Sequence, residues 1–211
     1  RYLAEYAYPI LKGSAEFLLD ILVEDGRGYL VTSPSVSPEN DFFEPINGKR
    51  VSTSYGATCD LAIIREIFAA TTSAAKILCV DEALQQQIKE ATVRLYPYQI
   101  GKQGGLQEWY HDWRDQDPRH RHQSHLFGLY PGHHLSVTET PDLAKACAKT
   151  LEIKGDETTG WSTGWRVNLF ARLQDAPGAY HIYRKLLRYV SPDGYNGKDA
   201  RRGGGTYPNL L

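Results

Sequence analysis

Apolar residues along this chain recur mostly with the period of an α-helix. Between Tyr2 and Val23, the positions that fall near one stripe are Leu3, Ala7, Ile10, Leu11, Leu18 and Leu22. Pro9 lies inside this segment, where it either kinks a helix or marks the true first turn of one. The pattern therefore predicts a helix here, over the whole segment or from Pro9 onward.

The same periodicity predicts five further helices. They are expected over residues 57–78, 81–95, 140–153, 161–173 and 176–190. Asp81 and Thr140 have side chains that suit helix N-caps, and Pro141 suits a first helical position. The joint at Gln174-Asp175 is so short that the last two helices are expected to form an antiparallel pair.

The connections between these helices are of two kinds, tight joints and long segments rich in Pro, Gly and Ser. The long segments cover residues 26–55, 97–140 and 191–207. Loops of this length in a compact domain are usually functional or disordered. The alternation predicts an all-α toroid of helical hairpins whose long loops build a cleft at one end. An irregular helical bundle is the alternative, and periodicity does not separate the two.

Composition narrows the class of partner. The 14 Tyr and 4 Trp outnumber the 6 Phe, which suits the half-apolar, half-wet surface of a sugar-binding cleft, although a Tyr-rich core and rim is the commoner explanation. The net charge of -1 gives no electrostatic reason to expect nucleic acid or an acidic membrane. The chain contains no Met and starts at Arg1, which indicates a processed product, an engineered segment or a fragment.

Residues 32–40, Thr-Ser-Pro-Ser-Val-Ser-Pro-Glu-Asn, form the first candidate site. The two prolines stiffen the backbone, and the hydroxyls of Ser33, Ser35 and Ser37 can tie it down. Glu39 is thereby presented at the end of a rigid segment, as a general acid requires. No basic residue lies within several positions of Glu39 to hold it ionised. Taken alone, an exposed loop glutamate is more often simply solvated.

Residues 120–125, His-Arg-His-Gln-Ser-His, carry three of the seven histidines beside an arginine. Donors that grip the hydroxyls of a polar ligand explain this density best. A metal site is disfavoured, because no Cys, Asp or Glu is suitably spaced and the three cysteines are scattered. A Ser–His hydrolase triad is disfavoured as well, because the G-x-S-x-G elbow is missing. No cofactor is expected.

Two aromatic positions complete the candidates. Glu108-Trp109 pairs an acceptor with an apolar face, which suits a pyranose, and a buried Trp beside a surface Glu is an equally good explanation. Trp161 opens an expected helix, where Ser162 can act as the cap, so a structural role is the simpler explanation there.

Taken together, these blocks resemble glycoside hydrolase family 95, the inverting α-L-fucosidases. The stretches that match are residues 8–13 with 16–17 and 19–20, 32–40, 63–68, 99–102 with 106–109, 120–132, and 159–165 with 168–169. Each stretch alone is a weak signal, but together they follow the order of the family and cover nearly the whole chain.

The resemblance implies that residues 1–211 are part of an (α/α)6-barrel catalytic domain that is incomplete at both ends. It implies hydrolysis of terminal α-L-fucosidic linkages, mainly α-1,2, with inversion, on a fucosylated oligosaccharide or glycan. It also implies that Glu39 protonates the glycosidic oxygen. The substrate-binding residues that it suggests are Arg121, His122, His125, Glu108, Trp109 and Trp161. Family habit suggests secretion.

The resemblance also implies that parts of the machinery lie elsewhere. In the family, a base-side aspartate lies just beyond the Tyr-Pro-Asn-Leu stretch that ends here at Leu211, and water-positioning asparagines lie upstream of Arg1. The isolated chain is therefore expected to be inactive. Apolar helix faces without partners predict low solubility or a broad, non-cooperative melt.

Three alternatives stay open. An α-L-galactosidase of the same family would act on a sugar with one more hydroxyl, at C6, so a single pocket residue could decide between the two sugars. A non-catalytic glycan-binding helical module would use Glu39 only as a hydrogen-bond acceptor. A helical scaffold without a ligand is the third alternative, and it fails if the long loops converge on a pocket that contains Glu39 and His122.

Overall fold

The computed structural model describes residues 1–188 and Thr206. Its helices are η1 (Leu3–Ala7), α1 (Tyr8–Ile21), α2 (Thr58–Leu78), α3 (Glu82–Arg94), η2 (Ser124–Leu126), α4 (Pro141–Lys154), α5 (Gly160–Arg172) and α6 (Ala176–Leu186). All six expected helical segments are found within a few residues of their predicted ends. The final helix, predicted to reach residue 190, ends at Leu186. Residues 189 and 190, the loop predicted over 191–207 apart from Thr206, and the Tyr-Pro-Asn-Leu stretch lie outside the described residues.

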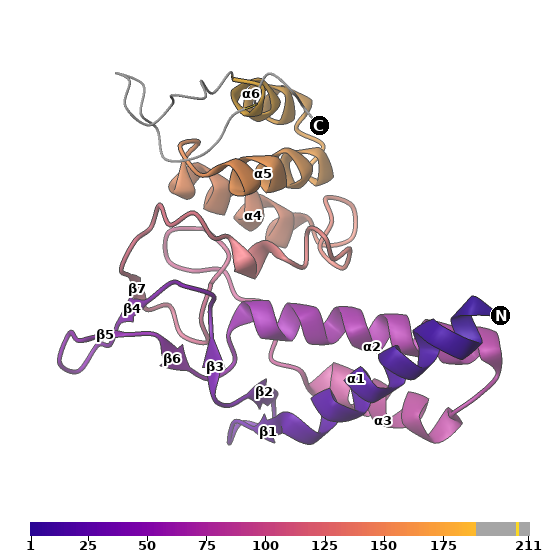
Figure 1. Ribbon diagram of the computed structural model, residues 1–211. Helices are drawn as coiled ribbons and strands as arrows, with labels where there is room; N and C mark the ends of the chain where they lie inside the picture. Colours follow the sequence, from indigo (N-terminus) through magenta and orange to yellow (C-terminus); the bar gives the residue numbers. More distant parts are fainter. Residues whose placement is uncertain (189–205, 207–211) are drawn as a thin grey trace.

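Three small antiparallel sheets occupy the connections around these helices (Figure 1). The strands pair as β1 (Leu22–Glu24) with β2 (Leu30–Thr32), β3 (Ser35–Val36) with β6 (Thr53–Ser54), and β4 (Phe42–Phe43) with both β5 (Arg50–Val51) and β7 (Arg114–Asp115). The prediction of an all-α fold, part of an (α/α)6 barrel, is therefore wrong. Strands of two or three residues are too short to show a readable alternation of apolar and polar positions, so the sequence pattern made these segments resemble loops.

The helices form two groups, which Figure 1 shows one above the other, with the strands at one side. In the first group, α1 and α3 pack against α2. The apolar stripe of α2 forms the centre of this core through Leu61, Ile64 and Phe68, and it meets Ala15 of α1 and Ile88 of α3. Each of these five side chains is at most 3% exposed, which agrees with the helices predicted over 57–78 and 81–95. The stripe read for the first helix is only partly buried, because Ile10 is 70% exposed and Ala15, which lies outside that stripe, packs in the core.

The second group contains α4, α5 and α6. Leu151 of α4 and Leu169 of α5 pack with Leu126 and Leu129. These two leucines follow residues 120–125, which we call the histidine-rich loop. The helices α5 and α6 pack side by side across their short joint (Figure 1), as the joint predicts. The carboxylate of Asp175 caps α6 by accepting a hydrogen bond from the backbone N–H of Gly178.

Two expected N-caps make other contacts instead. The carboxylate of Asp81 accepts hydrogen bonds from Tyr8 Oη and Lys12 Nζ, both at 2.8 Å, and these bonds tie α1 to the turn between α2 and α3. The bond from Lys12 is the main reason that the pKa of Asp81 lies below its ordinary value. The hydroxyl of Thr140 donates to the carbonyl oxygen of Ser136 and makes no cap bond to α4.

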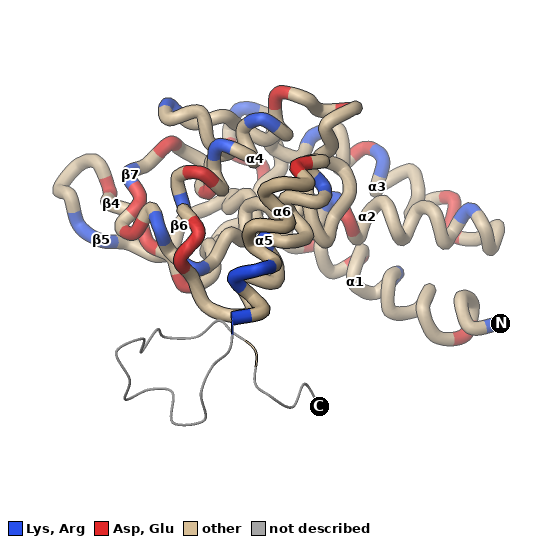
Figure 2. The backbone as a smooth tube through the Cα atoms, turned by 90° about the horizontal axis from the view of Figure 1, so that it is seen from above, with Lys and Arg blue, Asp and Glu red and all other residues tan. Residues whose placement is uncertain are grey.

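Charged residues of both signs are interspersed over the described chain (Figure 2). None of the helices described combines the length and the apolar character that crossing a bilayer requires. Large apolar side chains also remain at the surface of the described helices, among them Ile10, Phe17, Ile77 and Tyr180. These exposed faces are the feature behind the expectation of low solubility.

The core of the first helical group can be tested at Phe68, which is 1% exposed. Replacement by Ala leaves a cavity under α2, so we expect the free energy of unfolding to fall by about 3–5 kcal/mol. Urea unfolding followed by circular dichroism measures this change. The control is Val93→Ala on α3, at a side chain that is 77% exposed, for which we expect a change within about 0.5 kcal/mol. Equal losses in the two variants would contradict the packing described here.

Candidate active site

The backbone around Glu39 is held from beneath by buried polar side chains. Ser35 Oγ donates to Asp60 Oδ2 at 2.7 Å and accepts the N–H of Ala57 at 2.9 Å. Ser37 Oγ donates to Glu108 Oε1 at 2.6 Å. These bonds agree with the prediction for Ser35 and Ser37, whereas Ser33, the third serine of that prediction, is exposed.

Glu39 itself adopts a left-handed backbone conformation, with φ of 56°. A non-glycine residue rarely takes this conformation unless its surroundings hold it there. The side chain is 59% exposed, while its neighbours Ser37 and Asn40 are buried. The segment therefore presents one carboxylate outward from a fixed base.

Basic groups from the histidine-rich loop meet this carboxylate. Arg121 Nη2 donates to Glu39 Oε2 across 82 positions of sequence, and His122 Nε2 lies 3.3 Å from the same oxygen. Burial, opposed by the charge of Glu39, lowers the pKa of His122 below its ordinary 6.5, so its ring is mainly neutral at pH 7. The local sequence around Glu39 contains no basic residue, and the fold supplies two.

An aromatic side chain borders this cluster. Trp161, in the first turn of α5, is 51% exposed, and its ring lies perpendicular to that of His122 with centroids 5.0 Å apart. The next residue, Ser162, is buried, and its hydroxyl donates to the backbone oxygen of Arg121 at 2.6 Å. The sequence suggested that Ser162 caps α5. In the structure its hydroxyl instead fixes the loop that carries Arg121. We refer to Glu39, Arg121, His122 and Trp161 as the Glu39 cluster.

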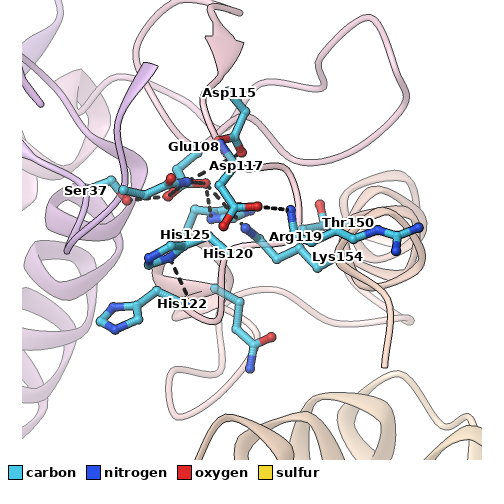
Figure 3. Close-up of polar contacts among 12 residues, drawn as sticks. Ser37, Glu108, Asp115, Asp117, Arg119, His120, His122, His125, Thr150 and Lys154 are labelled. Atoms are coloured by element: carbon cyan, nitrogen blue, oxygen red, sulfur yellow. Dashed lines mark hydrogen bonds and ion pairs between the residues drawn. The ribbon is translucent and has the colours of Figure 1, made fainter. Parts of the chain in front are cut away.

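A second group of polar residues lies buried next to the Glu39 cluster, around Glu108 (Figure 3). Asn40 Nδ2 lies 3.2 Å from both carboxylate oxygens of Glu108, in addition to the bond from Ser37. His125 Nδ1 lies 3.4 Å and Lys154 Nζ 3.8 Å from Oε2. Burial works against ionisation of Glu108, but His125, Lys154 and the two hydrogen-bond donors hold its pKa below the ordinary value.

The protonation of this group follows from its burial. Burial lowers the pKa of His125 to about 4, against the opposing charge of Glu108, so the ring is neutral at pH 7 and acts through its dipole. The ammonium group of Lys154, at the end of α4, is then the cation that faces Glu108. Lys154 was not singled out in the sequence, because a lysine in the last turn of a helix is explained by the helix dipole alone.

The structure thus divides the residues that the sequence proposed for substrate binding. Arg121, His122 and Trp161 lie around Glu39 at the surface. Glu108, His125 and Trp109 are buried, and their contact with a sugar stays a prediction. The ring of Trp109 packs on Phe42, with centroids 5.3 Å apart.

The buried group borders a cavity of about 300 Å³. Its polar lining includes Glu108, Asp115, His125 and Lys154, and neither Glu39 nor Arg121 is among the lining residues. Among the described residues, no group of three or more His, Cys, Asp or Glu side chains is arranged to hold a metal ion.

Comparison with known proteins now decides the family. The sequence-family model described as "Glycosyl hydrolase family 95 catalytic domain" matches residues 1–211. The chain belongs to glycosyl hydrolase family 95. This confirms the resemblance seen in the sequence.

The relatives of this family 95 chain are named as fucosidases. Over 211 residues it is 42% identical to a protein named alpha-L-fucosidase 2 from Arabidopsis thaliana. This alignment covers 100% of this chain and 24% of the relative. Over 187 residues it is 32% identical to a probable alpha-fucosidase A from Aspergillus niger, covering 83% of this chain and 23% of that one. The family 95 chain thus spans about a quarter of the length of the curated relatives it matches.

One carboxyl group of this family 95 site gives a pH-dependent prediction. Burial, with the nearby charge of Glu108, raises the pKa of Asp115 from 3.8 to about 6. The folded protein therefore binds the proton more tightly than the unfolded chain, so stability is lost progressively as the pH rises from about 4, and the loss is complete above about pH 6. At pH values near 7.5, Asp115→Asn is expected to raise the free energy of unfolding by about 1 kcal/mol, a figure reduced for partial exposure.

Urea unfolding at several pH values measures this effect. The gain from Asp115→Asn should shrink as the pH falls and disappear below about pH 4, where the carboxyl group is protonated in both states. Asp20→Asn, at an exposed position of α1, is the control for the same substitution made without burial. A gain that stayed constant with pH would contradict the protonation assigned to Asp115.

Proposed function

We propose that this chain contributes to the active site of a hydrolase of terminal α-L-fucosides, and that Glu39 is its general acid. The observation that carries the proposal is the setting of Glu39, an outward carboxylate on a strained and fixed backbone beside Arg121 and His122. A general acid has to meet the glycosidic oxygen at a defined distance, so its backbone must be fixed while its carboxyl group remains accessible.

The rest of the Glu39 cluster suits a deoxysugar. Arg121 and His122 present nitrogen donors for hydroxyl groups, and Trp161 presents an apolar face for the C–H side of the ring. Both donors approach Oε2 of Glu39. A sugar hydroxyl that takes over these donors releases the carboxyl group to hold the proton that the leaving group needs. The names of the relatives support fucose as that sugar.

We further propose that hydrolysis proceeds with inversion, mainly at α-1,2 linkages. An inverting glycosidase places a second group on the opposite face of the sugar to activate water, with the two carboxyl groups about 6.5–9.5 Å apart. The residues described here supply the acid side of such a site. The 211-residue chain is accordingly proposed to be inactive by itself.

The role of Glu39 can be tested in the full-length protein that carries this chain. Glu39→Gln keeps the shape of the side chain but removes its proton, so kcat on an α-1,2-fucosylated disaccharide is expected to fall by at least about 10²-fold. The exposed Glu90 of α3 gives the control, since Glu90→Gln should keep wild-type turnover. Wild-type turnover in Glu39→Gln would refute the role of Glu39. Sugar binding without turnover in the wild type would indicate a glycan-binding module instead.

The stereochemical course is a separate prediction. An inverting enzyme that acts on an α-L-fucoside releases β-L-fucose first, because water attacks from the face opposite the leaving group. Proton NMR of the anomeric signals, recorded before mutarotation equilibrates them, identifies the first product. First appearance of the α-anomer would show retention and would exclude the single-displacement mechanism.

A further inference from the structure

Glu108 lies where three segments of the chain converge: the segment of Glu39, the loop of Arg121 and the end of α4, which carries Lys154. Ser37 and Asn40, which donate to its carboxylate, stand two positions before and one position after Glu39. His125 comes from the loop that also carries Arg121. One buried carboxylate therefore joins the segment of the acid to the loop of its basic partners (Figure 3).

The segment of Glu39 needs such support. The strand that leads into it, β3, has two residues, so the backbone ladder contributes few hydrogen bonds. The left-handed conformation of Glu39 is unfavourable unless neighbouring groups fix it. The ion pair with Arg121 is largely exposed, and exposed ion pairs hold geometry weakly. The bonds from Ser37 and Asn40 to Glu108 are buried, so they are the stronger restraint.

The carboxylate of Glu108 is also engaged by protein groups on both of its oxygens. Its Oε1 accepts from Ser37 and Asn40, and its Oε2 faces Asn40, His125 and Lys154. Ser37 and Asn40 fill three of the roughly four acceptor positions that a carboxylate offers, and only 5% of the Glu108 side chain is exposed to a ligand. Glu108 is therefore better suited to hold the site than to bind substrate.

We propose that Glu108 is a positioning residue that holds Ser37 and Asn40 on either side of Glu39 and so fixes the direction of the acid. The inference rests on the proposed function of Glu39 and adds a residue that acts on the reaction through Glu39. A displacement of the acid by about 1 Å can cost about 10²-fold in rate, and so can loss of this support. The loss in rate should be largest for a substrate whose leaving group must be protonated.

The test exploits the leaving group. An α-1,2-fucosylated disaccharide has a poor leaving group that must be protonated, whereas 4-nitrophenyl α-L-fucoside has a leaving group that departs without one. In the full-length protein, Glu108→Gln is expected to lower kcat on the disaccharide by about 10²-fold, with a much smaller loss on the nitrophenyl fucoside and little change in KM. Glu152→Gln, at an exposed glutamate of α4, is the matched control and should leave both rates unchanged.

A variant that only damages the fold loses active molecules, and both substrates then suffer equally. Glu108→Gln leaves the buried Lys154 without its carboxylate, so it can fail to fold. Ser37→Ala keeps that pair and removes a single bond to Glu108, so it should show a smaller loss with the same preference for the disaccharide. Equal losses on the two substrates in Ser37→Ala, or no loss in a folded Glu108→Gln, would overturn the positioning role.

Failure of the proposed function gives a different result. Glu39→Gln would then keep wild-type turnover on both fucosides, and neither the acid nor its support would stand. If instead Glu39→Gln is selectively defective on the disaccharide while the Ser37 and Glu108 variants are not, the acid is retained and only the positioning role is lost.

Discussion

A carboxylate removed from water has to be satisfied by protein groups, because an unpaired buried charge is too unfavourable to persist. Glu108 is such a carboxylate, and its partners come from the segment before α2, from the histidine-rich loop and from the end of α4. The chain can satisfy Glu108 only by bringing these segments together. Their convergence also sets Glu39 beside Arg121 and His122, so the position of this exposed cluster depends on the buried charge of Glu108.

The first turn of α2 anchors this arrangement. Asp60 accepts hydrogen bonds from Thr32 and Ser35 on one side. Thr58 donates to the backbone oxygens of Gln107 and Glu108 on the other. Phe68 packs α2 into the core, and the hydrogen bonds at the start of the helix attach both segments of the site to it.

The sequence predicted the parts of the molecule that repeat and missed those that do not. Stripes such as Leu61, Ile64 and Phe68 recur at helical spacing over several turns, so the helices could be read directly. Strands of two or three residues contain no comparable repeat. The family resemblance assigned Glu39 and Arg121 to the same sugar site, but their ion pair was not predicted, since no local pattern relates positions so far apart. The sequence suggested either that Glu108 binds a sugar or that it is a surface residue beside a buried Trp109. Glu108 is itself buried, and the partners that this requires, such as Lys154, are revealed only by the folded chain.

The hydroxyl of Ser162 bonds to the backbone of Arg121, while its neighbour Trp161 faces solvent. Anchor and contact surface thus occupy consecutive residues of one helical turn, with opposite orientations. A change of the outward ring can therefore leave the buried hydroxyl bond, and with it the backbone of Arg121, in place. This separation lets the exposed face at the start of the helix vary in sequence while the backbone of the neighbouring loop stays fixed.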